Sequence, residues 1–243
     1  MSPPLFLSEP SRLESDRIVL DGPEGRHAAA VRRLRPGERV DLSDGEGRLV
    51  ECVVTAAERD SLHLEARERR HVPRPDPRIV VVQALPKGDR GELAVETMTE
   101  VGVDVIVPWT AARCVTQWRG ERRAKALARW RATAREAAKQ SRRAWLPEVT
   151  EPADTATAAE RVGGAALAVI LHEEAERPLS RVDVPDTGDI VVVVGPEGGL
   201  TDEEVAAFEA AGGGTVLLGP TVLRTSTAGV AAAAVLLSRA GRW

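Results

Sequence analysis

The alternation of hydrophobic and polar residues changes character along the chain. Up to residue 70, short runs that alternate hydrophobic and polar positions are separated by the turn dipeptides Pro36-Gly37 and Asp44-Gly45. This pattern is typical of short strands joined by tight turns. We expect a small β-barrel with one short helix at residues 25–34 and with strands at residues 17–20, 39–42, 49–54 and 61–64.

From residue 78 onward, short hydrophobic runs alternate with longer amphipathic segments. Strands that alternate with helices in this way predict an α/β fold, with a mainly parallel sheet covered on both faces. The expected strands are residues 79–84, 103–107, 165–171, 190–194 and 215–218, and the expected helices are residues 89–101, 119–142, 202–211 and 227–239. Thr201 and Glu204 form the pattern of a capping box, and Thr225 or Thr227 is expected to cap the last helix.

The two patterns meet at a proline-rich segment, residues 71–77. Its prolines at 73, 75 and 77 form a stiff linker that cannot join a sheet. We therefore predict a domain of residues 1–73 and a second domain of residues 74–243.

Charge is distributed unevenly along the chain. The net charge is −4, but the stretch from Arg113 to Arg143 is rich in Arg and Lys and contains only two acidic residues, Glu121 and Glu136. A second basic cluster, which includes Arg32, lies near the N-terminus. Two basic surfaces of this kind favour contact with nucleic-acid phosphates, and the alternative is that they are simply solvated helix faces.

The composition, the N-terminal sequence and the cysteines exclude several classes of protein. At 43% apolar and 29% charged residues, the chain has the composition of a soluble globular protein, and it contains no apolar run long enough to span a membrane. The N-terminus lacks the basic segment and apolar core of a signal peptide, so a cytoplasmic location is expected. Cys52 and Cys114 lie far apart and form no metal-ligand pattern, which indicates reduced structural thiols and no metal site.

The strongest local motif is a run of valines that leads directly into a glycine-rich turn, Val194-Gly195-Pro196-Glu197-Gly198-Gly199. In an open α/β sheet, such strand-end turns are where ligands bind, and glycines let a ligand approach the backbone closely. The run lacks the Gly-Lys-Ser/Thr of a phosphate-binding P-loop and the Gly-x-Gly-x-x-Gly of a dinucleotide site. The alternative interpretation is a tight turn with no ligand.

A second strand-end turn follows about twenty residues later, Leu218-Gly219-Pro220-Thr221-Val222-Leu223-Arg224-Thr225. Two successive strand ends with Gly-Pro turns are expected to lie side by side and to form one pocket. Together, the two motifs resemble those of the RsmE branch of the SPOUT methyltransferases, which form N3-methyluridine in 16S ribosomal RNA. The likeness extends upstream to Gln83, Lys87-Gly88 and residues 100–103.

The N-terminal region is also similar to this family. His27, Arg33 and Gly37, followed by Asp44-Gly45, look like the PUA-like RNA-binding module of the same enzymes. Three positions depart from the family pattern: other members often have Arg at 221, Glu at 226 and Glu at 139, where this chain has Thr221, Ser226 and Lys139. The effect of these three departures on function is left open.

The resemblance implies a SPOUT-type α/β domain at residues 74–243, with a C-terminal trefoil knot, and a PUA-like β-barrel at residues 1–73. It further implies S-adenosylmethionine as cofactor, 16S rRNA or the small ribosomal subunit as partner, a homodimer, and no metal or membrane. The cofactor-binding residues that it implies are Leu171, His172, Glu173, Val194, Gly195, Pro196, Glu197, Gly198, Gly199, Leu217, Leu218, Gly219, Pro220, Val222, Leu223, Thr227 and Ala228.

Methylation of uridine N3 requires that the N3 proton be removed and that the charge spreading to O2 and O4 be stabilised. Arg224, beside the second turn, is the first candidate for this stabilising cation, and Glu197 is a second catalytic candidate that can instead tie the turn together. The general base stays unassigned. The candidate RNA-binding residues are His27, Arg32, Arg33, Arg35, Arg113, Arg142 and Arg143.

Two other functions remain open at this point. One is a SPOUT enzyme that methylates the ribose 2′-oxygen, a class that usually has Ser-Leu-Asn where this chain has Leu223-Arg224-Thr225. The other is a non-catalytic RNA-binding factor in ribosome assembly that keeps the fold without the chemistry. Binding of S-adenosylmethionine separates this last alternative from the enzymes.

Overall fold

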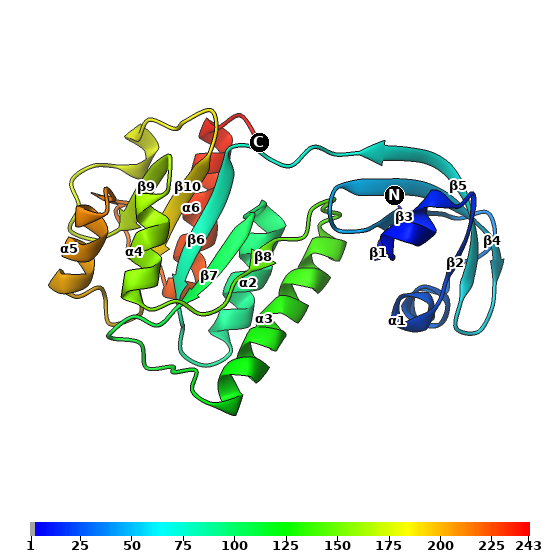
Figure 1. Cartoon of the computed structure of the whole chain (residues 1–243), viewed down its shortest axis with the longest axis horizontal. Coiled ribbons are helices and arrows are strands. Elements are labelled where there is room, and N and C mark those ends of the chain that lie inside the picture. Colours follow the sequence, from blue (N-terminus) through cyan, green and yellow to red (C-terminus); the bar gives the residue numbers. More distant parts are fainter. Residues whose placement is uncertain (1–2) are drawn as a thin grey trace. The chain divides into compact units, whose positions relative to one another are not determined.

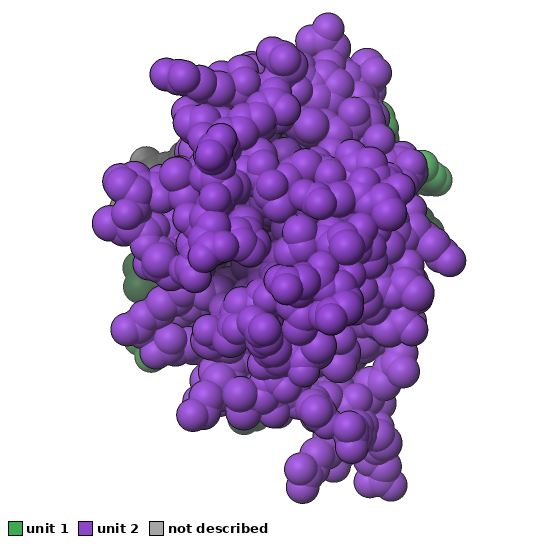
Figure 2. Space-filling view, turned by 90° about the vertical axis from the view of Figure 1, so that its left-hand side faces the viewer, with its two compact units in different colours: residues 1–74, 138–146 green, residues 75–137, 147–243 purple. Residues whose placement is uncertain are grey.

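Residues 3–243 are described by the computed structural model, in which the chain divides into two units. The first unit comprises Met1–Arg74 and Ala138–Leu146, and the second comprises Pro75–Ala137 and Pro147–Trp243 (Figure 2). The division expected from the sequence, 1–73 and 74–243, did not anticipate that residues 138–146 belong with the first unit. At position 139, where other family members often have Glu, the ammonium of Lys139 forms a 2.8 Å ion pair with Glu24 in the first unit.

The first unit is a five-stranded sheet with order β1-β3-β4-β5-β2. Its β1 pairs with β3 in parallel, and the other pairs are antiparallel. The strands are β1 (Leu5–Leu7), β2 (Arg17–Leu20), β3 (Arg39–Ser43), β4 (Arg48–Ala57) and β5 (Leu62–His71). Alternate side chains of these strands enclose a core of aliphatic residues, Phe6 and Cys52.

The helical part of the first unit differs from the single helix expected at residues 25–34. A 3-10 helix, η1 (Pro10–Glu14), follows β1. A short α-helix, α1 (Gly22–Arg26), continues into one turn of π-helix, η2 (His27–Val31). Gly25 is required in α1, because a Cβ at this position would lie 2.3 Å from the backbone oxygen of Leu20.

The second unit contains a six-stranded parallel sheet with order β11-β9-β10-β6-β7-β8 (Figure 1). Its strands are β6 (Arg78–Ala84), β7 (Val105–Trp109), β8 (Glu148–Val149), β9 (Leu167–Leu171), β10 (Asp189–Val194) and β11 (Gly214–Val216). Residues 190–194 of β10 are all buried although successive side chains point to opposite faces. Both faces of the central sheet are therefore covered, as the valine run predicted.

The second unit also contains α2 (Arg90–Val101), α4 (Thr155–Gly163), α5 (Asp202–Ala210) and α6 (Thr225–Arg239), with a 3-10 turn, η3 (Leu179–Arg181). Most of α3 (Glu121–Gln140) also belongs to it, whereas residues 138–140 at the end of this helix belong to the first unit. α6 packs on α2, β6 and β10, whereas α4 packs on α5, β7 and β9. The capping box at Thr201 and Glu204 is confirmed. The expected cap on the last helix is wrong, because α6 begins at Thr225, its N-cap is Arg224, and no side chain caps it.

The C-terminal part of the chain is hydrogen-bonded to the connection between β9 and β10. The backbone of Leu217 exchanges hydrogen bonds with Arg177 and Leu179 of that connection, each at 2.8 Å. At the other end of α6, the guanidinium of Arg239 donates to the carbonyls of Ser180 and Val182. The chain between β11 and α6 is thus held against an earlier loop, an arrangement that agrees with the expected knotted C-terminal segment.

Arg242, beyond α6, donates to the backbone oxygen of Pro77 and forms an ion pair with Asp104 at 2.7 Å. Within residues 3–243, no helix combines the length and the apolar content that crossing a membrane requires.

Candidate functional site

Three strand ends lie together at one edge of the sheet in the second unit. β9, β10 and β11 are parallel, and β9 pairs with both of the others. Because parallel neighbours end at the same edge, the loops after Leu171, Val194 and Val216 are brought side by side. These loops carry almost all of the cofactor-binding residues that the sequence analysis expected.

The glycine-rich turn after β10 is fixed from two sides. The guanidinium Nη1 of Arg113 donates to the carbonyls of Gly198 and Leu200, each at 3.0 Å. The carboxylate of Glu197 accepts a hydrogen bond from the backbone N–H of Lys87 at 3.0 Å. Gly199 has φ = 73°, in the left-handed region where glycine costs least. The turn is therefore held in one shape before any ligand arrives.

These contacts bear on two of the candidate residues. Arg113 was expected to contact RNA, but its guanidinium lies on the glycine-rich turn, which favours a role in holding that turn. Glu197 was a candidate for catalysis, and its engaged carboxylate favours the structural alternative. Lys87 matched the family pattern, but its sequence position alone indicated no role.

The loop after β11 presents open backbone groups. Within the described residues, the backbone N–H groups of residues 218, 219 and 221–223 donate to no other backbone group. A Cβ added at Gly219 would meet nothing within 4 Å, so there is space beside this part of the loop. A heterocycle whose edge is recognised by N–H and C=O groups fits such a loop, and the adenosine of S-adenosylmethionine is a group of this kind.

The loop leads into the start of α6, where buried polar residues meet. Thr225 and Ser226 are 5% and 3% exposed. The amide of Gln83, at the end of β6, donates to the backbone oxygen of Thr225 at 3.2 Å. Gln83 Oε1 is buried and has no hydrogen-bond partner within the described residues. Gln83, for which the sequence alone indicated no role, therefore links the central sheet to the start of α6.

Arg224 lies between this loop and α6. Its carbonyl accepts from the backbone N–H groups of Thr227 and Ala228, each at 2.9 Å, which fixes its backbone. Its side chain is exposed and, within residues 3–243, forms no ion pair or hydrogen bond. The structure thus leaves a cation free at the rim of the three loops.

The first loop contributes His172, whose ring Nδ1 accepts a hydrogen bond from the backbone N–H of Glu174 at 3.2 Å. The backbone N–H of His172 donates to Val216 at 3.0 Å and so joins the first loop to the third. His172 therefore shapes the loop through both its ring and its backbone.

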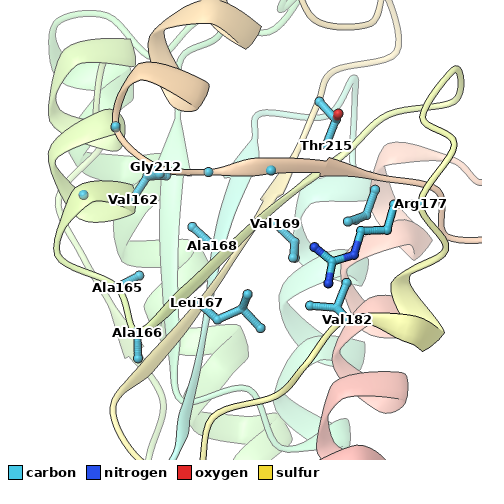
Figure 3. A pocket seen from close by; sticks show the side chains of 15 residues that line it. Val162, Ala165, Ala166, Leu167, Ala168, Val169, Arg177, Val182, Gly212 and Thr215 are labelled. Atoms are coloured by element: carbon cyan, nitrogen blue, oxygen red, sulfur yellow. The ribbon is translucent and has the colours of Figure 1, made fainter.

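A cavity of the second unit lies elsewhere. It has a volume of about 370 Å³ and is lined by β9, β11 and the residues before each of them (Figure 3). The residues that line it are mostly aliphatic residues and glycines, and Arg177 reaches in from one side (Figure 3). None of the expected cofactor-binding residues lines it, so we place the candidate site at the strand ends, where open backbone groups and a free cation occur together.

The remaining candidate residues for RNA contact, His27, Arg32, Arg33, Arg35, Arg142 and Arg143, all belong to the first unit. Arg33 and Arg142 have φ angles of 55° and 57°, so each ends its helical turn in the left-handed region. Among the described residues, no group of three or more His, Cys, Asp or Glu side chains is placed to hold a metal ion.

Comparison with known families gives two matches. Residues 73–237 match the model of an RNA methyltransferase domain, and residues 20–66 match that of an RNA methyltransferase PUA domain. The chain is 48% identical to ribosomal RNA small subunit methyltransferase E of Mycobacterium bovis, over 93% of this chain and 87% of the relative. The protein of the same name from Bacillus subtilis is 29% identical over 88% of this chain and 87% of the relative.

Solved structures give a similar result. Ribosomal RNA small subunit methyltransferase E of Neisseria gonorrhoeae, bound to S-adenosylmethionine, superposes with a TM-score of 0.82 at 29% identity, covering 98% of both chains. A methyltransferase of Legionella pneumophila with bound S-adenosylmethionine gives a TM-score of 0.86 at 27% identity, again over 98% of both chains. The expected fold class, a SPOUT-type α/β domain with a PUA-like N-terminal domain, is thereby confirmed.

Proposed function

Because this chain belongs to the ribosomal RNA small subunit methyltransferase E family of RNA methyltransferases, we propose that it transfers a methyl group from S-adenosylmethionine to N3 of one uridine in 16S rRNA of the small ribosomal subunit. The observation that carries this proposal is the set of three strand-end loops with open backbone groups beside the free guanidinium of Arg224. The loops supply a site for the cofactor, and the guanidinium supplies charge for the base.

When bound, S-adenosylmethionine supplies an electrophilic methyl carbon. The chain's own contribution is mainly to orient the reactants, since displacement at this carbon needs the attacking nitrogen in line and at near-attack distance. Arg113 and Lys87 serve this end by fixing the turn at residues 195–199 before binding. Because the turn is already ordered, binding of S-adenosylmethionine costs less conformational entropy, which favours affinity for the cofactor.

Arg224 is proposed to act on the uridine. N3–H is a weak acid, and loss of its proton spreads negative charge to O2 and O4 of the base. An unpaired guanidinium at the rim of the pocket stabilises that charge more than it stabilises the neutral base, and so it lowers the barrier. We keep Glu197 as a structural residue because its carboxylate already accepts from Lys87. The residue that receives the proton is left unassigned.

The direct test uses purified protein, labelled S-adenosylmethionine, and small subunits or naked 16S rRNA from a strain that lacks the modification. We expect N3-methyluridine as the product, identified by mass spectrometry of the nucleosides. Methylation of a ribose 2′-oxygen would replace the proposal with the first alternative enzyme. Absence of both cofactor binding and product would favour the non-catalytic assembly factor.

Arg224→Ala and Arg224→Lys separate chemistry from binding in the same assay. The alanine variant is expected to lower kcat by about 100-fold, the scale for loss of one group that stabilises transition-state charge. Its affinity for S-adenosylmethionine is expected to stay within about threefold of wild type, because a contact made only in the transition state does not contribute to ground-state binding. The lysine variant should recover part of kcat. Equal losses of kcat and cofactor affinity would place Arg224 in the cofactor pocket instead.

We further propose a homodimer in the cytoplasm, where ribosomal subunits are assembled. Val222 and Leu223, within the third loop, are 77% and 40% exposed, and a partner chain would cover such apolar side chains. Light scattering of the eluted protein is expected to give twice the chain mass of 26.0 kDa. A Val222→Asp variant is expected to elute as a monomer with reduced cofactor affinity, and a monomeric wild type would exclude this assembly.

A further inference from the structure

A small basic pocket lies entirely within the first unit. It has a volume of about 50 Å³ and is formed by the start of the chain, the π-helical turn η2 and the residues that end α3. Its lining residues are Pro4, Leu5, Phe6, His27, Arg32, Lys139, Gln140 and Arg142. One wall thus comes from residues 139–142, a segment far from the PUA-like region in the sequence.

The charges around the pocket are not equivalent. Lys139 is 5% exposed and its ammonium lies 2.8 Å from Glu24, so this charge is compensated within the wall. Arg142 interacts electrostatically with Asp41, a carboxylate whose pKa is raised mainly by burial. Arg32 is exposed and, within residues 3–243, its side chain has no ion pair or hydrogen bond. Arg32 is therefore the cation most available to an incoming anion.

The backbone at the C-terminal end of α3 disfavours an anion less than an open helix end does. The C-terminal end of a helix presents carbonyl groups that repel negative charge. Here the N–H of Arg142 donates to Lys139 at 3.2 Å, and the N–H of Arg143 donates to Ala138 at 2.9 Å. These bonds close the turn and occupy two of the terminal carbonyls. On the opposite side, the ring of His27 packs edge-on against Phe6 with centroids 5.8 Å apart, which fixes its orientation.

The size of the pocket limits what it can hold. A water molecule needs about 10–15 Å³ by a comparable measure, whereas pockets for whole small molecules begin near 300 Å³. A volume of about 50 Å³ suits one tetrahedral oxyanion and excludes a nucleobase. We propose that this pocket receives one backbone phosphate of the rRNA substrate, with Arg32 as the principal contact and His27 and Arg142 beside it. The inference rests on the proposed function, because it takes rRNA as the substrate.

The experiment compares full-length Arg32→Gln with Arg59→Gln. Arg59 is an exposed arginine in the same unit, has no ion pair in the described part of the chain, and does not line the pocket. Both variants lose one charge from the same unit, so overall attraction to RNA falls equally. Binding of naked unmodified 16S rRNA is measured by filter retention over a range of salt concentrations, and KM for the RNA is measured in the methylation assay.

We expect Arg32→Gln to raise the Kd and KM for RNA about threefold to tenfold and to lower the slope of log K against log salt by about 0.7 to 0.9, the value for one lost phosphate contact. Arg59→Gln should stay within about twofold of wild type, and both variants should bind S-adenosylmethionine normally. Arg142→Gln, checked for folding by its Tm, should repeat the RNA result. Equal behaviour of Arg32→Gln and Arg59→Gln would overturn the proposal.

Two further outcomes separate the possible sources of failure. If wild type neither binds S-adenosylmethionine nor methylates RNA, the proposed function fails and not merely the pocket. Inorganic phosphate is titrated alone by calorimetry. One outcome is that phosphate binds wild type but not Arg32→Gln, while this variant keeps the wild-type Kd for RNA and the wild-type salt slope. In that case the pocket is a site for free phosphate, and the rRNA assignment is overturned.

Discussion

The carboxylate of Glu197 and the backbone N–H of Lys87 form a 3.0 Å hydrogen bond that joins two loops 110 residues apart in the sequence. One loop follows β10 and the other follows β6, its neighbour in the sheet. Since a charged acceptor on a backbone donor is stronger than a neutral pair, this bond is well suited to hold the glycine-rich turn. It also gives the carboxylate a role that does not require proton transfer.

The first prediction follows for Glu197→Gln and Glu197→Ala. Glutamine keeps an oxygen that accepts from Lys87, so we expect its cofactor Kd to rise less than fivefold and its kcat to stay near wild type. Alanine leaves the Lys87 N–H without this acceptor, and the Kd should rise about tenfold, or about 1.4 kcal/mol. Calorimetric titration with S-adenosylmethionine gives the Kd, and a pH–rate profile gives the kinetic behaviour. A large fall in kcat for the glutamine variant, with a lost limb of the pH profile, would show that Glu197 is the general base.

The second prediction concerns Arg113, which braces the same turn from its other side. Arg113→Ala removes two hydrogen bonds to carbonyls and should weaken binding of S-adenosylmethionine about tenfold to 100-fold, with a smaller effect on kcat for RNA held at saturation. Arg181→Ala removes an exposed arginine from η3 and is the matched control. If Arg113 acts chiefly on RNA, its variant will instead raise KM for RNA and leave the cofactor Kd unchanged.

The elements that could be predicted from the sequence are those with buried hydrophobic runs or a clear capping pattern. The β10 valines and the capped start of α5 lie where they were expected, because burial on both faces and a capping box leave strong local patterns. Helix α4 was not predicted, although Asp154 caps it by accepting from Thr157. Its nine residues bury only Ala158 and Val162, and they are fewer than the roughly 11–18 residues over which helical periodicity is counted.

Other features depend on contacts that no local pattern records. β5 runs on to His71 through exposed charged residues, because pairing with β4 sustains it where hydrophobic alternation has ended. Residues 138–146 join the first unit through tertiary contacts such as that between Lys139 and Glu24, separated by 115 positions. The cofactor loops were expected from motifs at strand ends, whereas the bond between Lys87 and Glu197 required the order of the strands in the sheet.

The third prediction tests how closely α6 approaches the sheet. In an exposed helix, replacing glycine by alanine stabilises by about 1 kcal/mol. At Gly229 a Cβ would lie 2.9 Å from the sulfur of Met98 and 3.2 Å from Oε1 of Gln83, and both of these side chains are fully buried. We therefore expect Gly229→Ala to destabilise the protein by about 1–3 kcal/mol, measured by urea unfolding.

Gly214→Ala is the control for this measurement, because a Cβ at Gly214 meets nothing within 4 Å and its φ is not in the left-handed region. This variant should lie within about 0.5 kcal/mol of wild type, as is usual for surface substitutions. A stabilising Gly229→Ala would mean that Met98 and Gln83 move aside easily, and that the start of α6 is not closely packed on the sheet.

The last prediction concerns Cys52, a thiol in the core of the first unit that is 1% exposed. Burial, aided by the nearby Asp41, raises its pKa from 9.0 to about 12. In the unfolded chain the thiol ionises near pH 9, while in the folded protein it stays protonated. The unfolded state therefore binds fewer protons above pH 9, and the free energy of unfolding falls as the pH rises from about 9 to about 12.

Urea unfolding of wild type and Cys52→Ala between pH 7 and pH 10 isolates this contribution, since other titrating groups are common to both proteins. The alanine variant carries a cost that is independent of pH, whereas wild type should lose about 1 kcal/mol more than the variant by pH 10. Because the thiolate is the reactive form, Cys52 should also resist thiol reagents at pH 8 until the first unit unfolds. Parallel pH profiles for the two proteins, or fast labelling of Cys52 in the folded state, would show that the thiol titrates as an exposed one.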